Sequence, residues 1–121
     1  MKSIIPLEQD VQKAILTYLK NHPKVAWAAR FNSGSAPLIG KNGRPRPVKF
    51  NNLKGCPDIF GQLTNGTLLA IEVKRPGWIK PKDDREFDQL TFLETVCANR
   101  GLGFFATSVA QVESRLLLFV A

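Results

Sequence analysis

Two short apolar segments, residues 58–63 and 68–74, lie on either side of an Asn65-Gly66 pair. An Asn-Gly pair between two such segments is the strongest short-range signal for a β-hairpin. A hairpin determines which residues face each other across the strands and which side of the sheet each side chain occupies. This segment therefore constrains the fold more than any other part of the chain.

Two turn lengths are compatible with Asn65-Gly66, and they place Asp58 differently. A two-residue turn would set Asp58 opposite Val73, on the wrong face to meet Glu72. A three-residue loop, with Gly66 in the left-handed region, would set Asp58 directly opposite Glu72. We predict the three-residue loop or an equivalent one-residue bulge, which brings two carboxylates to one face of the sheet.

Hydrophobic periodicity and turn residues predict seven elements in the order αβββαβα. This order indicates an α/β fold, a mixed central sheet flanked by helices. The expected elements are a helix from Pro6 to Asn21, strands at 25–32, 58–63 and 68–74, a helix from Asp83 to Gly101, a strand at 103–107 and a final helix from Ser108. Trp27, in the first of these strands, is expected in the core.

The chain has 121 residues, of which 44% are apolar and 22% charged, so we expect one globular domain spanning residues 1–121. No segment approaches the roughly 20 apolar residues that span a bilayer, and the N-terminus lacks the apolar core of a secretory signal. We therefore expect a soluble, intracellular protein without a membrane partner. Cys56 and Cys97 are too few for a disulfide framework or a four-cysteine zinc site.

The positive charge of the chain is concentrated in its first half. The net charge is +7, and residues 1–54 carry ten cations against two acids. Residues 33–54 lack periodicity and predict a long basic loop rather than regular structure. Such a local positive field favours a polyanion partner, most often nucleic acid. We expect phosphate contacts from its five cations, Lys41, Arg44, Arg46, Lys49 and Lys54.

Glu72-Val73-Lys74 is the segment most typical of a catalytic site. Side chains alternate along a strand, so Glu72 and Lys74 share one face. A carboxylate can bind a hard divalent cation, and an ammonium can orient water or neutralise charge on a phosphate. Asp58 would supply the second acid that such a metal needs. A cross-strand ion pair is the ordinary alternative for this spacing.

Three further features surround these residues. Glu8 lies at the margin of the apolar stripe of the first helix, where it would either reach a metal or simply favour the helix N-terminus. Gln89 lies about one turn into the second helix and could bond a ligand water or a phosphate. Gly55 and Pro57 shape the approach to Asp58. The single histidine, His22, and Cys56 are interpreted as structural residues rather than as a base or a nucleophile.

Together these motifs resemble the PD-(D/E)XK nuclease superfamily, and specifically the stand-alone virus-type replication-repair nucleases (VRR-NUC). The matching residues extend over nearly the whole chain and are Glu8, Gly55-Cys56-Pro57-Asp58, Glu72-Val73-Lys74-Arg75-Pro76-Gly77 and Gln89. The resemblance implies a restriction-endonuclease-like core and a metal-dependent DNA endonuclease. The long basic segment 33–54 is its unusual feature.

The resemblance also implies roles for these residues. Asp58, Glu72 and the backbone carbonyl of Val73 would hold Mg²⁺ or Mn²⁺, joined by Glu8 directly or through water. Lys74 would position the nucleophilic water, and Gln89 would support the site. Similar stand-alone nucleases are homodimers that cut four-way DNA junctions and occur in phages and bacteria. We therefore expect branched DNA as substrate, a homodimer, a cytoplasmic location in a bacterium or infected host, and no nucleotide cofactor.

The loop after Lys74 carries a second group of candidate DNA contacts, namely Arg75, Trp78, Lys80 and Lys82. Trp78 could stack on an unpaired base, although loop tryptophans often only pack. Alternatives remain open at this point. They are a non-catalytic or partner-dependent DNA-binding protein, a flap- or duplex-cutting nuclease, a restriction-type enzyme, and a regulatory module that binds an acidic protein.

Overall fold

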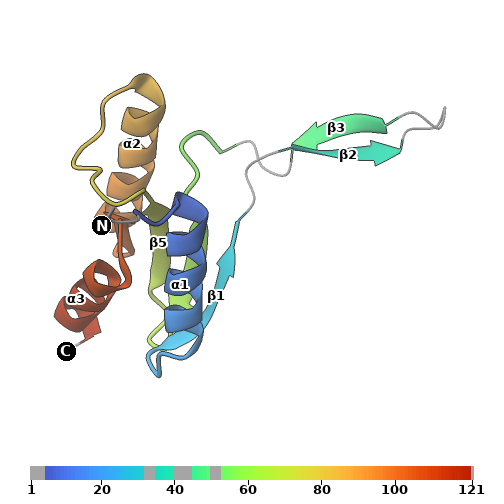
Figure 1. Cartoon of the computed structure of the whole chain (residues 1–121). Helices are drawn as coiled ribbons and strands as arrows, with labels where there is room; N and C mark the ends of the chain where they lie inside the picture. Colours follow the sequence, from blue (N-terminus) through green and yellow to red (C-terminus); the bar gives the residue numbers. More distant parts are fainter. Residues whose placement is uncertain (1–4, 32–34, 40–44, 50–52, 121) are drawn as a thin grey trace.

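A computed structural model describes residues 5–31, 35–39, 45–49 and 53–120 of the chain. The elements in chain order are α1 (Glu8–Lys20), β1 (Val25–Arg30), β2 (Ser35–Ile39), β3 (Pro45–Lys49), β4 (Ile59–Leu63), β5 (Leu68–Val73), α2 (Asp84–Ala98), β6 (Leu102–Ala106) and α3 (Val109–Val120). Figure 1 shows their arrangement.

Four of the strands form one mixed sheet in the order β1-β4-β5-β6. β1, β4 and β5 are antiparallel neighbours, and β6 runs parallel to β5. The parallel pair is joined through α2, as a crossover connection requires. The structure thus confirms an α/β fold with a mixed sheet flanked by helices.

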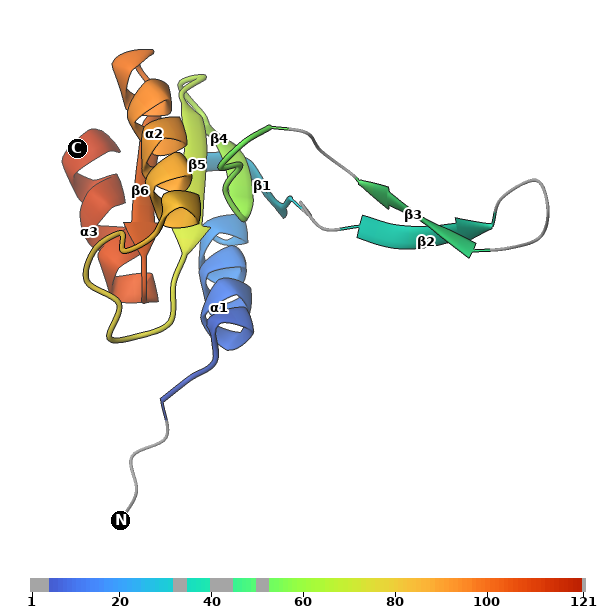
Figure 2. The ribbon, with the colours of Figure 1, turned by 90° about the horizontal axis from the view of Figure 1, so that it is seen from above.

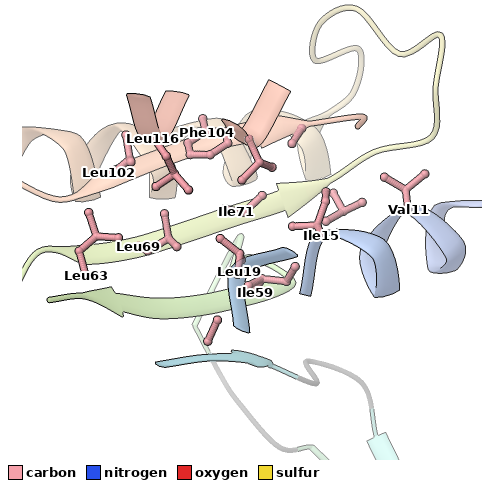
Figure 3. Close-up of a cluster of buried hydrophobic side chains, with 14 residues drawn as sticks. Val11, Ile15, Leu19, Ile59, Leu63, Leu69, Ile71, Leu102, Phe104 and Leu116 are labelled. Atoms are coloured by element: carbon pink, nitrogen blue, oxygen red, sulfur yellow. The ribbon is translucent and has the colours of Figure 1, made fainter. Parts of the chain in front are cut away.

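The two faces of the sheet pack against different helices. Alternate β5 residues, among them Leu69 and Ile71, point toward α1 and α3 and form the main core, which includes Ile15 of α1 and Leu116 of α3 (Figure 3). Ala70 points to the other face, toward α2. Glu72 shares that face with Ala70 because side chains alternate along the strand. The acid of the Glu-x-Lys motif therefore lies beneath α2 rather than in the main core.

The segment 33–54 differs from the expected aperiodic loop, because it contains β2 and β3. These strands pair as an antiparallel two-stranded ribbon, in which Pro37 faces Pro47. Proline lacks the N–H that a central strand needs, so prolines argue against a strand in the sequence. A two-stranded ribbon has only edge strands, which tolerate proline. In both views the ribbon extends away from the four-stranded sheet (Figures 1 and 2).

The expectation that Trp27 is buried is wrong. Its side chain is 48% exposed, and its Nε1 donates a hydrogen bond to Gln62 Oε1 at 3.2 Å. The pairing of β1 with β4 shifts register between Val25 and Trp27, which changes the alternation of faces. α2 packs on β5 and β6 and leaves the outer strand β1 uncovered on that side.

Within the described residues, no helix is both long enough and apolar enough to cross a lipid bilayer.

Candidate active site

The β4–β5 hairpin has the predicted register. Ile59 pairs with Ile71, and the Leu63 amide donates to the Thr67 carbonyl at 2.9 Å. Gly66 has a φ of +93°, a conformation that glycine adopts without the steric cost of a Cβ. The three-residue loop is therefore confirmed, and the same register extended by one residue sets Asp58 opposite Glu72.

Asp58 lies one residue before β4 and binds the end of β5. Its Oδ2 accepts a hydrogen bond from the Val73 amide at 2.9 Å, and its carboxylate is hydrogen-bonded to the Glu72 side chain. Val73 itself turns its side chain into the main core on the opposite face, where it is fully buried. Asp58 and Glu72 therefore meet on the α2 side of the sheet, as the metal-site interpretation requires.

Glu72 is the most unusual ionisable group among the described residues. It is 3% exposed, and its Oε1 has no hydrogen-bond partner in the described part of the chain. Burial raises the pKa of Glu72 to about 9, with further contributions from its hydrogen bond to Asp58 and from the Asp58 charge, against an opposing effect of Lys74. A buried acceptor without a donor costs stability, and a bound ligand would remove that cost.

Lys74 follows directly on β5 and is only 9% exposed. Its backbone amide donates to the Ala106 carbonyl at 2.9 Å, which extends the parallel pairing with β6. Its Nζ lies 3.1 Å from Oε2 of Glu86, in the first turn of α2. The ammonium is thus held by a carboxylate outside the Asp58–Glu72 pair.

Glu86 is the main site residue that sequence reasoning missed. The sequence indicates only a helix-capping pair, and Asp83 Oδ1 does accept from the Glu86 amide at 2.8 Å. The Glu86 side chain, however, accepts from Trp78 Nε1 at 2.8 Å and from the Lys82 amide at 3.0 Å. Burial alone would raise the pKa of Glu86, but the hydrogen bonds from Lys74, Trp78 and Lys82 outweigh it and lower that pKa.

Gln89 points from α2 into the protein and is 5% exposed, with an Oε1 that lacks a partner among the described residues. The helix comes close to the segment before Asp58 at Gly55, where a Cβ would lie 2.2 Å from the Asp88 carbonyl oxygen. Only glycine fits there, and Gly55 also has a φ of +73°. Gly55 therefore permits the close approach of α2 to the segment before Asp58.

Glu8 lies in the first turn of α1 and is exposed. Partial burial and the carboxylate of Asp58 raise the pKa of Glu8, while Lys74 and Arg85 oppose this effect. The charges of Asp58 and Lys74 thus act on Glu8. One turn later Gln12 is 6% exposed, a second buried polar residue that sequence reasoning missed. The available signal was a glutamine inside the apolar stripe, between Val11 and Ile15.

Cys56 and His22 have structural surroundings. Cys56 is buried, and burial together with the charges of Glu72 and Asp58 raises the pKa of its thiol, which disfavours the reactive thiolate. His22 follows the end of α1, where its Nδ1 accepts from the Lys24 amide at 3.0 Å. Cys56 and His22 thus both contribute to local structure.

Within the described ranges, no group of three or more His, Cys, Asp or Glu side chains is arranged to hold a metal ion. The donors that do meet are the oxygens of the Asp58 and Glu72 carboxylates. The amide oxygen of Gln89 is also buried and has no partner among the described residues. Mg²⁺ and Mn²⁺ prefer oxygen ligands, and Mg²⁺ usually takes only one or two protein carboxylates together with water. The residues present therefore fit a hard divalent cation.

The candidate DNA contacts fall into three groups. Lys41 and Arg44 lie outside the described residues, whereas Arg46 and Lys49 belong to strand β3. Lys54 is exposed, and its Nζ lies 3.7 Å from Asp88 Oδ1. In the β5–α2 loop, the cations Arg75, Lys80 and Lys82 are exposed, whereas Trp78 is half-buried against Phe105.

In comparisons with known proteins, no family model matches this chain, and no curated protein matches it either.

Proposed function

We propose that this protein is a metal-dependent endonuclease that hydrolyses phosphodiester bonds in DNA. The observation that carries the proposal is the meeting of Asp58 and Glu72 at the end of the β4–β5 hairpin, next to the buried Lys74. Two carboxylates with an adjacent ammonium suit a reaction in which a hard cation and a fixed positive charge act on one phosphate. The resemblance of the sequence motifs to the VRR-NUC nucleases points the same way.

Asp58 and Glu72 would hold Mg²⁺ or Mn²⁺, with the Val73 carbonyl as a further ligand and Glu8 acting directly or through water. When bound, the cation would supply Lewis-acid stabilisation of the phosphate and lower the pKa of a bound water. The unpartnered oxygens of Glu72 and Gln89 support this assignment, because each is a buried acceptor that a cation or its water would satisfy.

The side chains around the metal site would have separate roles in the reaction. Lys74 would donate a hydrogen bond to the attacking water or to a phosphate oxygen and neutralise charge that develops there. Its ammonium is already held by Glu86, so little reorganisation is needed when the substrate binds. Glu72 must lose its proton to bind the cation, so protons and metal compete for this carboxylate.

Branched DNA, most notably a four-way junction, is the substrate that we propose. The positive charge of the first half of the chain supports a nucleic-acid partner. A homodimer with two equivalent sites would match the symmetry of a four-way junction. The preference for a junction and the dimer both rest on the resemblance.

The test is cleavage of end-labelled DNA by the wild type and by Asp58→Asn, with Glu113→Gln as a control on the exposed side of α3. A four-way junction, a 5′ flap and a linear duplex are each incubated with Mg²⁺, Mn²⁺ or EDTA. We expect metal-dependent cleavage of the junction by the wild type and the control, and none by Asp58→Asn. The amide oxygen that this substitution introduces would still accept the hydrogen bond from the Val73 amide, so the fold is preserved.

Cleavage that persists in EDTA or in Asp58→Asn would refute the metal site. Salt-sensitive binding without any cleavage would instead favour a non-catalytic or partner-dependent DNA-binding protein. Cleavage of the flap and the duplex at the same rate as the junction would support the nuclease and refute the preference for junctions.

A further inference from the structure

A cavity of about 450 Å³ that is open to solvent lies beside Lys74, between the β5–α2 loop and α3. Trp78 of the loop, Phe105 and Thr107 at the end of β6, and Ala110 and Arg115 of α3 line it. Its volume falls in the range of about 300–1,000 Å³ that is usual for small-ligand sites. The Asp58–Glu72 pair is not among its lining residues, so the cavity is distinct from the metal site.

An aromatic pair forms one wall of this cavity. The rings of Trp78 and Phe105 have centroids 4.5 Å apart and are tilted by 35°. The Trp78 indole is held by its hydrogen bond to Glu86 Oε2 at 2.8 Å, so its ring is oriented before any ligand arrives. A preoriented aromatic surface at the edge of a cavity is suited to stacking of a planar ring.

The aromatic pair is also close to the ammonium that we place at the phosphate. Lys74 Nζ lies 5.9 Å from the centroid of Trp78 and 5.9 Å from that of Phe105. A nucleotide carries its base and its phosphate on one sugar, a few ångströms apart. A phosphate at Lys74 would therefore place an adjoining base at the mouth of this cavity.

The remaining lining residues suit a nucleotide rather than an apolar ligand. Thr107 and the α3 residues Gln111 and Ser114 offer hydrogen-bond groups. The guanidinium carbon of Arg115 lies 4.9 Å from the centre of the Phe104 ring. At the rim, Ile79 is 83% exposed, between Trp78 and Lys80. Apolar side chains such as isoleucine are inserted between base steps by several DNA-bending proteins, where they partly unstack the bases.

We infer that this cavity binds one unpaired base of the DNA strand whose neighbouring phosphate lies at Lys74, an inference that rests on the proposed nuclease function. A base within an intact duplex is stacked and paired, so it cannot enter. A base at a branch point or flap can enter at low cost. The cavity thus gives a physical reason for the enzyme to select branched DNA.

The test uses a flap substrate in which one nucleotide at a time is replaced by an abasic residue. Binding is measured with Ca²⁺ and with EDTA, using the Asp58→Asn protein, so that the result does not depend on cleavage. Loss of one base–aromatic stacking contact weakens binding about tenfold, so we expect one abasic position with that effect and little effect elsewhere.

Two variants report on the cavity itself. Ala110→Trp would fill it from α3 without removing a hydrogen bond, and Ala98→Trp places the same side chain on an exposed position of α2 that does not line the cavity. We expect the position-specific effect to disappear in Ala110→Trp and to persist in Ala98→Trp. Trp78→Leu, which removes the stacking ring, should behave like Ala110→Trp.

A flat abasic profile with intact DNA binding would overturn the inference, as would an unchanged profile in Ala110→Trp. Competition by free deoxyadenosine monophosphate at comparable affinity would assign the cavity to a free nucleotide and overturn the strand assignment. A position-specific profile in a protein that never cleaves DNA would support the cavity and refute the nuclease. Cleavage combined with a flat abasic profile would support the nuclease and refute base binding in the cavity.

Discussion

Replacing Glu72 with glutamine should stabilise the metal-free protein while removing its response to metal. Glu72 is 3% exposed, and burial raises its pKa to about 9 from an ordinary value of 4.5. In the unfolded chain this carboxyl ionises in water above about pH 4.5, whereas the fold keeps it protonated. The folded state then binds one more proton, so the free energy of unfolding falls as pH rises between these two pKa values.

The size of this effect follows from the linkage relation. At about 1.4 kcal/mol for each pH unit above 4.5, the cost of folding with Glu72 reaches about 3 kcal/mol near pH 7. Glu72 is coupled to Asp58, so we take about 2 kcal/mol as the expected value. Glutamine has the shape of the protonated acid and can still donate to Asp58, but it has no proton to lose. For a chain of this length, about 2 kcal/mol corresponds to roughly 8 °C in Tm.

The assay is thermal unfolding at about pH 5 and about pH 8 in EDTA, and again with excess Mn²⁺. We expect Glu72→Gln to raise Tm in EDTA, more strongly at the higher pH. We expect Mn²⁺ to stabilise the wild type more at the higher pH, because fewer protons compete for the carboxylate, and to leave Glu72→Gln unchanged. Glu94→Gln, on the exposed side of α2, is the matched control.

A lower Tm of Glu72→Gln in EDTA near pH 8 would refute the reasoning, because it would mean that the ionised carboxylate stabilises the fold. Stabilisation of the variant by Mn²⁺ equal to that of the wild type would show that the metal binds elsewhere.

Three other predictions concern the groups around this pair and the basic segment. Lys74→Ala should abolish DNA cleavage and leave junction binding within a few-fold of the wild type, because it removes one phosphate contact among many; normal turnover would remove Lys74 from the mechanism. Glu86→Gln should retain most of the activity, since the amide oxygen can still accept a hydrogen bond from Trp78. Glu86→Ala should lower kcat at least tenfold with little change in circular dichroism. A kcat of Glu86→Ala equal to that of the wild type would show that Glu86 does not position Lys74. Neutralising three cations of the 33–54 segment together, Arg44, Arg46 and Lys49, should weaken DNA binding and flatten its dependence on salt. An unchanged salt slope, measured by fluorescence anisotropy, would exclude these cations as phosphate contacts.

The sequence predicts the central feature of the site because that feature depends on local chemistry. Asn65-Gly66 permits the left-handed residue that a three-residue loop needs, and the alternation of side chains then decides which face Glu72 occupies. Both depend on neighbouring residues in the chain. The register that pairs Ile59 with Ile71 is therefore predictable from the sequence.

Other parts of the fold could not be predicted, because the relevant contacts join distant segments. The three prolines of β2 and β3 argue against strands in the sequence, and only their pairing as an isolated ribbon makes them acceptable. The exposure of Trp27 depends on a shifted register in β1 and on how far α2 extends across the sheet. Neither can be inferred from the residues beside Trp27.

By itself, the sequence determined which chemical groups are available and which strand face carries Asp58, Glu72 and Lys74. Only the tertiary structure decided their environment. Burial under α2 gives Glu72 its raised pKa, and the return of the β5–α2 loop brings Glu86 and Trp78 to Lys74. The physical reason is that side-chain direction follows the period of the local backbone, whereas burial and charge pairing depend on segments that meet only when the chain has folded.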